Sequence, residues 1–272
     1  MLTQKGTDKI QSYSFEYEGA KITLVDTPGF DDTKRSGIEI LQEIADWTSA
    51  AYKKKKLLSG IIYLHPVTHI RMEGSAMKNL RMFQNLCGQK VLGNVFLTTT
   101  QWSNVNLAEA EFRENRLRNQ DFWGGLIRKG ATLERFYGTR ESGLELIHKL
   151  MPNIPKPLDI QEQIVEQNMT LLETNAGKCL NEELIVQEKK FKKELESLEK
   201  SRQEAIAAKD NEMRDILAAE QEKARKKLEK AAAETKLLAE LHVTGIQKRE
   251  AEGKERQEEI KQGTTRRNSK KQ

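Results

Sequence analysis

The residues best suited to chemistry follow a short apolar segment near the N-terminus. Residues 22–25 are rich in β-branched side chains, Asp26 ends the run, and a Thr-Pro pair leads to Gly29. This order predicts a buried strand that enters a loop at its carboxyl end. A carboxylate there could hold Mg²⁺, directly or through water, and Gly29 would let its backbone N–H approach a terminal phosphate because it has no Cβ. The alternative interpretation is a plain strand followed by a Pro-Gly turn.

Strands and helices alternate around this segment. Residues 12–17 alternate aromatic and polar side chains, and residues 21–25 return after a Glu-Gly turn, which predicts an antiparallel hairpin. The other expected strands cover residues 60–64, 94–98 and 131–137, and the expected helices cover residues 36–58, 75–86, 107–129 and 142–150. We expect the third of these helices to be interrupted near Trp123. Such alternation predicts an α/β fold, with a mostly parallel sheet and helices on both faces.

The composition changes after a cluster of prolines. All aromatic residues except Phe191 precede position 140, so we expect the core in the first ~150 residues. Pro152, Pro155 and Pro157 then break the chain, which predicts a globular domain over residues 1–157. Residues 158–262 are dominated by good helix formers and predict a long helical or coiled-coil arm. The basic residues 263–272 are expected to form a disordered tail.

The arm carries an incomplete heptad pattern. Its apolar seam positions are Phe191, Leu195 and Leu198, followed after a slip in register by Met213, Leu217, Ala224 and Leu228. Arg202 and Lys209 stand where apolar seam residues would be expected. The pattern favours one or two long helices in a coiled coil, through which the protein could form homo- or hetero-oligomers. A single charged helix without a partner is the alternative.

Charge, cysteine content and hydropathy exclude several classes of protein. The net charge of +5 and the pI of about 9.0 come largely from runs at residues 53–56 and 266–271. Such runs are usually solvated surface, so nucleic acid is an unlikely partner. Cys87 and Cys179 match no metal-ligand spacing and are typical of reduced thiols in an intracellular, cytoplasmic protein. No apolar run reaches the ~18 residues of a transmembrane helix, and residues 1–5 resemble neither a signal nor a transit peptide.

Several segments together resemble one protein family. They are DTPGFDD at 26–32, GIIYLH at 60–65, RMEGSAMKNLRMF at 71–83, LCG at 86–88 and NVFLTTTQW at 94–102. As a set they resemble fungal G-domain proteins of the septin-like and AIG1-like GTPase group, within the P-loop GTPase superfamily. The resemblance covers roughly residues 1–150. It implies a domain that binds GTP and Mg²⁺ and hydrolyses the γ-phosphate, followed by a charged helical arm.

The resemblance also implies roles at the phosphate end of the nucleotide. Asp26 becomes the Mg²⁺-linked acid, and Gly29 the donor of a backbone N–H to the γ-phosphate. Thr27 accompanies them in the motif without a direct metal contact. Thr3 resembles the switch threonine that closes over Mg²⁺, and an ordinary polar terminal residue is the alternative. No residue is assigned a catalytic role.

Other matches concern the base. Thr99 and Trp102 occupy the place of the guanine-reading motif, and Gly138 with Thr139 matches the backbone loop that touches the base. No acid stands at the base-reading position, which leaves guanine selectivity open. His65 departs from the family pattern, and we interpret it as a core-edge histidine at a strand end rather than as a nucleotide ligand.

The phosphate-binding loop of this family is not found in the sequence. No G-x-x-x-x-G-K-[ST] pattern occurs, and that loop with its strand and helix should precede residue 1. We expect one of two explanations. Either the sequence lacks the N-terminal segment of a GTP-binding protein, or the G domain is degenerate and acts as a non-enzymatic interaction protein through its arm.

Overall fold

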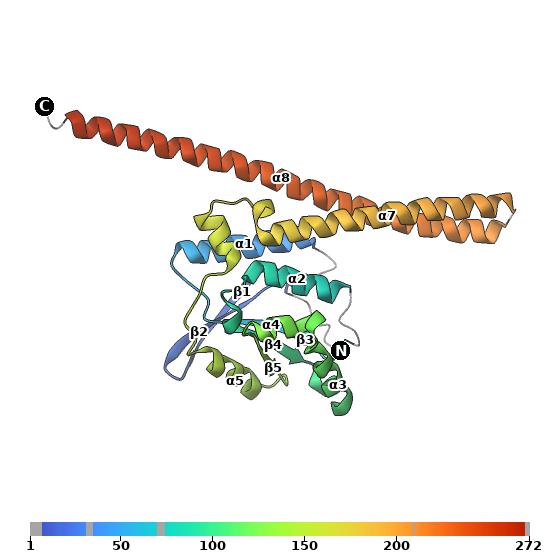
Figure 1. Cartoon of the computed structure of the whole chain (residues 1–272), viewed down its shortest axis with the longest axis horizontal. Coiled ribbons are helices and arrows are strands. Elements are labelled where there is room, and N and C mark those ends of the chain that lie inside the picture. The colour runs from blue at the N-terminus through green and yellow to red at the C-terminus, as the bar shows by residue number, and fades with distance from the viewer. Residues whose placement is uncertain (1–6, 31–34, 70–73, 209, 270–272) are drawn as a thin grey trace. The chain divides into compact units, whose positions relative to one another are not determined.

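The structure is a computed structural model that describes residues 7–30, 35–69, 74–208 and 210–269 (Figure 1). The chain divides into an N-terminal unit, residues 1–167, and a C-terminal unit, residues 168–272. The division falls after the expected boundary at residue 157, because the segment beyond the prolines packs back onto the first unit. Leu158 and Ile160 are buried there, and Gln161 Nε2 donates to the backbone O of Thr48 at 2.9 Å.

The hairpin expected near the N-terminus is present. Strands β1 (Gln11–Tyr17) and β2 (Ala20–Asp26) pair antiparallel, from Gln11 opposite Asp26 to Tyr17 opposite Ala20. Glu18 and Gly19 turn the chain with φ of 49° and 76°, a backbone geometry that suits a two-residue hairpin loop. Asp26 is therefore the last residue of its strand, as the sequence predicts.

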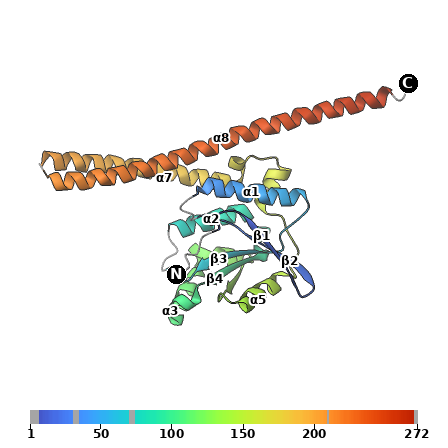
Figure 2. The same cartoon turned by 180° about the vertical axis from the view of Figure 1, so that it is seen from behind.

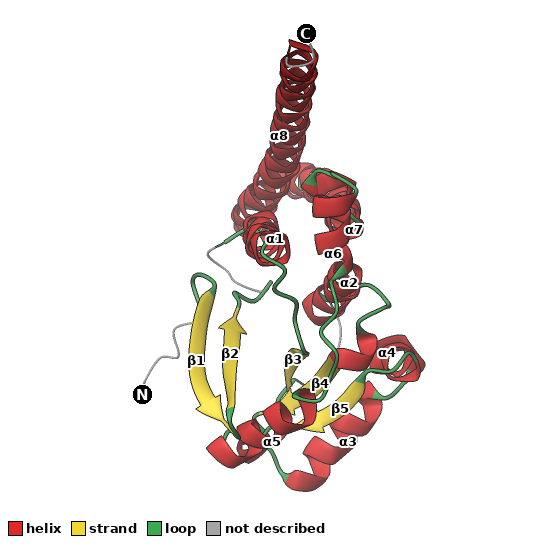
Figure 3. Cartoon of the chain, turned by 90° about the vertical axis from the view of Figure 1, so that its left-hand side faces the viewer, coloured by secondary structure: helices red, strands yellow, loops and turns green. Residues whose placement is uncertain are grey.

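The remaining strands form a second sheet. Strands β3 (Ile61–Pro66), β4 (Val95–Thr100) and β5 (Thr132–Arg135) are parallel and lie in the order β3-β4-β5. This confirms a parallel sheet for three strands but corrects the expectation of one continuous sheet, because β2 and β3 share no ladder. Figure 3 shows the hairpin and the three-stranded sheet as separate groups of strands.

Helices cover both faces of the parallel sheet, as expected. On one face, Val95 and Leu97 pack in a cluster with Leu80, Leu117 and Trp123, among other residues. On the other face, Phe96 packs with Leu146 and Leu150. The alternation of residues 95–97 is the period of two that a strand imposes, and apolar side chains on both faces are typical of a parallel strand.

Most helices begin and end near the expected residues. In the N-terminal unit they are α1 (Gly37–Lys53), α2 (Ser75–Cys87), η1 (Leu92–Asn94), η2 (Trp102–Asn104), α3 (Leu107–Leu117), η3 (Gln120–Gly124), α4 (Gly125–Arg128), α5 (Arg140–Leu150), α6 (Asp159–Gln161) and η4 (Glu162–Glu166). The interruption expected near Trp123 is the π-helical η3, in which Phe122 has non-helical φ and ψ of −114° and −110°. A Cβ on Gly124 would lie 2.4 Å from the backbone O of Arg118, so glycine permits this tight return.

The C-terminal unit is a helical hairpin. After the short η5 (Leu171–Glu173), helices α7 (Asn175–Ala207) and α8 (Asn211–Ser269) run antiparallel and side by side (Figure 1 and Figure 2). The direction follows from contacts across the pair, Arg202 with Gln221 and Glu188 with Thr235. The described arm is a pair of packed helices, which differs from the alternative of a single charged helix without a partner. Helix α8 also continues through residues 263–269, most of the stretch expected to be disordered.

The seam between the two helices has a regular heptad spacing. On α8 the shielded positions are Leu217, Gln221, Ala224, Leu228, Ala231, Thr235, Leu238, His242, Gly245 and Arg249, and on α7 they are Leu184, Glu188, Phe191, Leu195, Leu198, Arg202 and Ala205. Met213 lies outside this seam with 46% of its surface exposed, which corrects its expected place. Arg202 does occupy a seam position, and Lys209 lies outside the described residues.

Candidate functional site

The parallel strands bring several side chains to one edge of the sheet. Thr99 of β4 lies between His65 of β3 and Arg135 of β5 in the strand register. Gly138 and Thr139 follow β5 and therefore lie at the same edge, where ligands bind in open parallel α/β sheets. The structure therefore brings the carboxyl ends of β4 and β5 to one edge, with Thr99 near the end of β4 and Gly138 after β5.

Thr99 and Trp102 are tied into a buried polar network at this edge. Thr99 Oγ1 donates to Glu114 Oε1 at 3.0 Å, and Trp102 Nε1 donates to the backbone O of Thr99 at 3.2 Å. Arg135 donates through Nη2 to Glu114 Oε2 at 2.6 Å, and its guanidinium lies 4.2 Å from the centre of a Trp102 ring. Hydrogen bonds to Glu114 raise the pKa of Arg135 above its usual value.

This network is closed to ligands in the arrangement described here. Thr99 has 0% and Trp102 has 7% of its surface exposed, and Trp102 packs in a cluster with Val67 and Ala110. Their polar groups already have partners within the protein. Recognition of a base by these two side chains would require them to leave the core, so the geometry does not fit the base-reading role implied by the family resemblance.

The Asp26 segment is open to solvent. Asp26 Oδ2 accepts a hydrogen bond from Thr7 Oγ1 at 2.5 Å, and the side chain is otherwise exposed. Thr27 and Gly29 are exposed as well, and a Cβ on Gly29 would have no atom within 4 Å. Thr3 lies outside the described residues. An exposed carboxylate beside an unobstructed backbone is compatible with a hydrated cation and a phosphate group.

Gly138 and Thr139 form the loop between β5 and α5. Gly138 has a φ of 80°, which favours glycine, and both residues are exposed. Thr139 caps α5, because its Oγ1 accepts a hydrogen bond from the backbone N of Ser142 at 3.2 Å. The Gly138 backbone remains available to a ligand, whereas the Thr139 hydroxyl already serves the helix.

The residues present fit Mg²⁺ with a nucleotide only at the phosphate end. No group of three or more potential metal ligands occurs among the described residues. Mg²⁺ in nucleotide sites usually binds one or two protein carboxylates and completes its coordination shell with phosphate oxygens and water. The single carboxylate of Asp26 could therefore supply the protein ligand. The base end does not fit, because Thr99 and Trp102 are buried.

Sequence reasoning missed Glu114 and Arg135. Glu114 is 2% exposed and belongs to the inward stripe of α3, with Ala110 and Leu117. A carboxylate on the apolar face of an amphipathic helix is the signal that could have revealed it, because such a group is rarely buried without a cationic partner. The partner itself lies on a strand 21 residues away and has no local signature.

His65 is where the sequence places it, at the edge of the core. It precedes Pro66 at the end of β3, has 5% of its surface exposed and contacts Trp123 edge to face, with ring centres 5.7 Å apart. Burial, and then the neighbouring His69, lower its pKa to about 4. The side chain is therefore neutral near pH 7.

Comparisons with known proteins give a distant likeness to solved structures. No protein-family model matches the chain, and no curated protein matches it. Among solved structures, the chain is similar to Toc33 from Arabidopsis thaliana in a dimerization-deficient mutant, with 12% sequence identity and a TM-score of 0.39. The likeness covers 48% of this chain and 57% of that chain. The search for membrane spans found no helix of sufficient length and apolar character among the described residues.

Proposed function

We propose that the N-terminal unit is part of a guanine-nucleotide-binding domain of the septin-like and AIG1-like kind. The observation that carries this proposal is the exposed Asp26-Thr-Pro-Gly29 segment at the carboxyl end of β2. The order of elements after it, with parallel strands β3, β4 and β5 separated by helices, agrees with the resemblance. Asp26 would hold Mg²⁺, and the Gly29 backbone N–H would donate to the terminal phosphate.

The edges of the two sheets support the same proposal. Among the described strands, β2 pairs only with β1, and β3 pairs only with β4. Each of these edge strands carries an exposed leucine, Leu24 at 40% and Leu64 at 58%. Unpaired edges with exposed apolar side chains are normally covered in native proteins. A strand that leads into a phosphate-binding loop, supplied by residues outside this sequence, would satisfy both edges.

Bound GTP and Mg²⁺ would supply the reacting phosphoryl group and the charge that stabilises it. The residues of this chain would contribute only the positioning of the ligand and the negative charge that holds Mg²⁺. Asp26 fixes the cation, and the open backbone at Gly29 orients the terminal phosphate. The proposal therefore concerns nucleotide binding, and hydrolysis needs groups that these residues do not provide.

The test compares nucleotide binding by two forms of the protein. The coding sequence upstream of Met1 is searched for an in-frame strand and Gly-Lys-Ser or Gly-Lys-Thr loop, and the longer chain is produced together with the 272-residue chain. Fluorescent GTP is titrated onto each, with Mg²⁺ and with a chelator, and ATP serves as the competitor. We expect Mg²⁺-dependent GTP binding by the longer chain and much weaker binding by the 272 residues, because most of the phosphate cradle is in the loop. Absence of Mg²⁺-dependent binding by the longer chain would exclude the proposal.

A second candidate function is a non-enzymatic scaffold. It is favoured by the burial of Thr99 and Trp102 and by the helical hairpin, whose long charged surfaces suit assembly with other helices. In this case the degenerate domain would serve only as a folded platform. The same titration separates the candidates, because micromolar GTP binding by the 272 residues alone would exclude a scaffold without nucleotide.

A further inference from the structure

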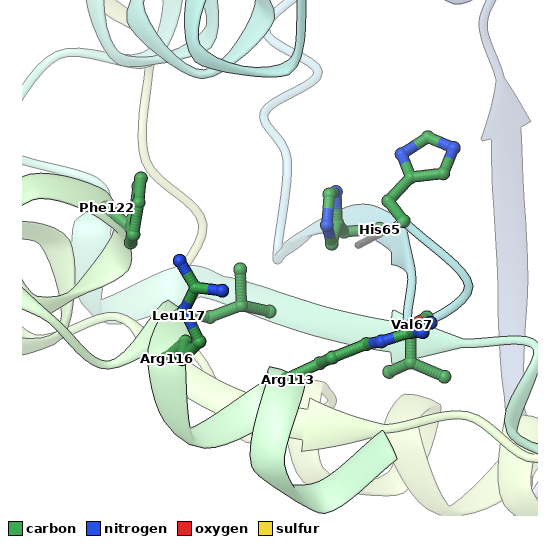
Figure 4. Close-up of a pocket in the computed structure, with 7 residues that line it drawn as sticks. His65, Val67, Arg113, Arg116, Leu117 and Phe122 are labelled. Carbon is green, nitrogen blue, oxygen red and sulfur yellow. The ribbon is translucent and has the colours of Figure 1, made fainter. Parts of the chain in front are cut away.

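A small pocket lies between the end of β3 and the last turns of α3 (Figure 4). Its lining includes His65, His69, Arg113, Arg116, Leu117 and Phe122. The cavity volume of about 20 Å³ suits one small polar group rather than a nucleotide. None of the residues assigned above to nucleotide binding lines it, so the pocket is separate from that proposed function.

Arg113 forms a fixed wall of this pocket. Its Nη1 donates to the backbone O of Val67 at 2.9 Å and of Thr68 at 3.1 Å. Its Nη2 pairs with Glu109 Oε1 on the same helix. These partners hold the guanidinium in place and offset its charge, so Arg113 shapes the pocket and is not its principal cation.

Arg116 is the cation that has no partner within the part of the chain that the structure describes. Its side chain is exposed, and its guanidinium makes no hydrogen bond or ion pair to a described residue. In the view of Figure 4 it lies between Phe122 and His65. Among the described residues that line the pocket there is no carboxylate, which leaves this lining net positive. A planar guanidinium binds carboxylate and phosphate oxygens through two parallel hydrogen bonds.

Two buried donors, one in the lining and one in contact with it, also lack acceptors among the described residues. His65 is 5% exposed, and its ring has no hydrogen bond to a described residue. A neutral imidazole still carries one N–H donor. The indole N–H of Trp123, whose ring contacts His65, is fully buried without a partner. Buried donors are normally satisfied in native proteins, so these groups indicate an acceptor that is external to the described residues.

We propose that this pocket binds one small oxyanion, a carboxylate or a phosphate group, with Arg116 as its charged partner and the His65 ring N–H as a neutral donor. Leu117 and Phe122 form the apolar sides of the pocket and keep water from competing for these hydrogen bonds. Among the described residues of the lining, Arg116 is the one arginine without a partner. The pocket therefore suits a single anionic group.

The experiment follows the indole N–H signals of the 272-residue protein by NMR. The chain has three tryptophans, and Trp123→Phe assigns the relevant signal. Sodium phosphate and sodium acetate are titrated separately at constant ionic strength, with sodium chloride as the reference salt. We expect a saturable shift of the Trp123 signal with at least one oxyanion. A response to phosphate alone or to acetate alone supports the pocket and identifies which oxyanion it prefers.

Three variants test whether the shift comes from this pocket. Arg116→Gln should weaken binding about 10-fold, because it removes a charge-assisted, two-bond contact. Arg118→Gln makes the same charge change at an exposed residue outside the lining and should leave the titration unchanged. His65→Phe should weaken binding as well, and the exposed Arg116 keeps the test valid if that core variant fails to fold. Equal weakening by both arginine variants, or no saturable shift with either oxyanion, would overturn the proposal.

Discussion

Arg135 reaches from β5 to the buried carboxylate of Glu114 on α3, and its Nη2 lies 2.6 Å from Glu114 Oε2. The Arg135 Nε also donates to both carboxylate oxygens at 3.1 Å. Glu114 is 2% exposed, so its charge depends on this partner. The pair joins α3 to the sheet at the edge where Thr99 and Trp102 lie, and both residues contact it, Thr99 through Glu114 and Trp102 through Arg135.

Loss of the Glu114 charge should therefore destabilise the N-terminal unit. We expect Glu114→Gln to lower the free energy of unfolding by about 3 kcal/mol, because it removes the closest anion of the partly buried Arg135 and leaves only Glu111 Oε1, 3.4 Å from Arg135 Nη1. Urea unfolding followed by tryptophan fluorescence measures the change. Glu109→Gln, on the same helix but 54% exposed, is the matched control and should cost less than about 1 kcal/mol. Equal losses of unfolding free energy in the two variants would show that burial does not increase the contribution of the Glu114–Arg135 pair to stability.

The sequence predicts local structure well and long-range pairing poorly. The alternation in residues 12–17 sets the hairpin, and Asp26 ends its strand as expected, because both features depend on neighbouring residues alone. The Glu114 and Arg135 pair depends on how α3 packs against β5, and no local pattern encodes that distance. The division of the chain after residue 167 depends on the same kind of long-range contact, since Leu158 and Ile160 are buried against an earlier part of the chain.

The candidate site shows the same division. The motif around Asp26 predicts a strand that ends in a loop, and Asp26 does end β2 with an exposed side chain beside an open Gly29, because a strand followed by a loop is a local event. Thr99 lies near the end of β4, and Trp102 follows that strand. Their burial could not be foreseen, because it results from the contacts of Trp102 with Arg135, Val67 and Ala110, which are far apart in sequence.

Gly88 should tolerate no side chain. It ends α2 with a φ of 76° and a ψ of −178°, a region that is almost exclusive to glycine, and a Cβ would lie 1.9 Å from Asp159 Cγ. We expect Gly88→Ala to lower the free energy of unfolding by about 3 kcal/mol, through backbone strain and the clash together. Chemical unfolding measures this value. Gly93→Ala, where a Cβ has no atom within 4 Å, is the control and should change stability little.

The Asp159→Ala background separates the two causes. Without the Asp159 carboxyl the clash disappears, and Gly88→Ala should then cost only the strain of about 1–2 kcal/mol. An unchanged cost in that background would show that Asp159 does not restrict the site.

Stability should depend on the protonation of His65. Its folded-state pKa of about 4 lies below the ordinary value of 6.5, so the folded protein favours the neutral ring. The corresponding stability is fully present above pH 6.5 and is lost as the pH falls toward 4. The slope for this one group approaches ~1.4 kcal/mol per pH unit between these values.

A comparison of variants isolates that contribution from the titration of carboxylates. The difference in unfolding free energy between the natural protein and His65→Gln should shrink by about 1.2 kcal/mol from pH 7 to pH 5.5. Urea unfolding at the two pH values gives the difference. His148→Gln, at a histidine with a side chain 62% exposed, should show no such change. A pH-independent difference for His65→Gln would mean that the folded protein accommodates the protonated ring.

Asp26 should matter for a ligand and little for the fold. Its only described side-chain partner is Thr7, and the residue is exposed, so Asp26→Asn should lower the ligand-free stability by less than about 1 kcal/mol. In the form of the protein that binds GTP, the thermal stabilisation by GTP with Mg²⁺ should fall sharply, because it follows binding affinity. Differential scanning fluorimetry measures both, and Asp46→Asn on α1 is the control. A large loss of ligand-free stability with an intact nucleotide shift would make Asp26 a structural residue.

The polar layer in the helical hairpin should fix its register. Arg202 Nη1 donates to Gln221 Oε1 at 3.1 Å, Gln221 Nε2 donates to Glu199 Oε2 at 2.6 Å, and Arg202 Nε is buried without a partner. Gln221→Leu alone should lower stability by about 2 kcal/mol, because it leaves more of the Arg202 guanidinium unpaired. Arg202→Leu combined with Gln221→Leu should instead raise the thermal midpoint, because an apolar pair continues the seam of Leu198 and Ala224.

The double variant should also lose specificity. A polar seam residue selects one register and one oligomeric state, so its removal should let the two helices pair with those of another molecule. Circular dichroism measures the thermal midpoint, and size-exclusion chromatography with light scattering measures the mass. Lys226→Leu, at an exposed position of α8, controls for added apolar surface. A double variant that is less stable than Gln221→Leu would contradict the prediction, because the layer would then contribute stability as well as register.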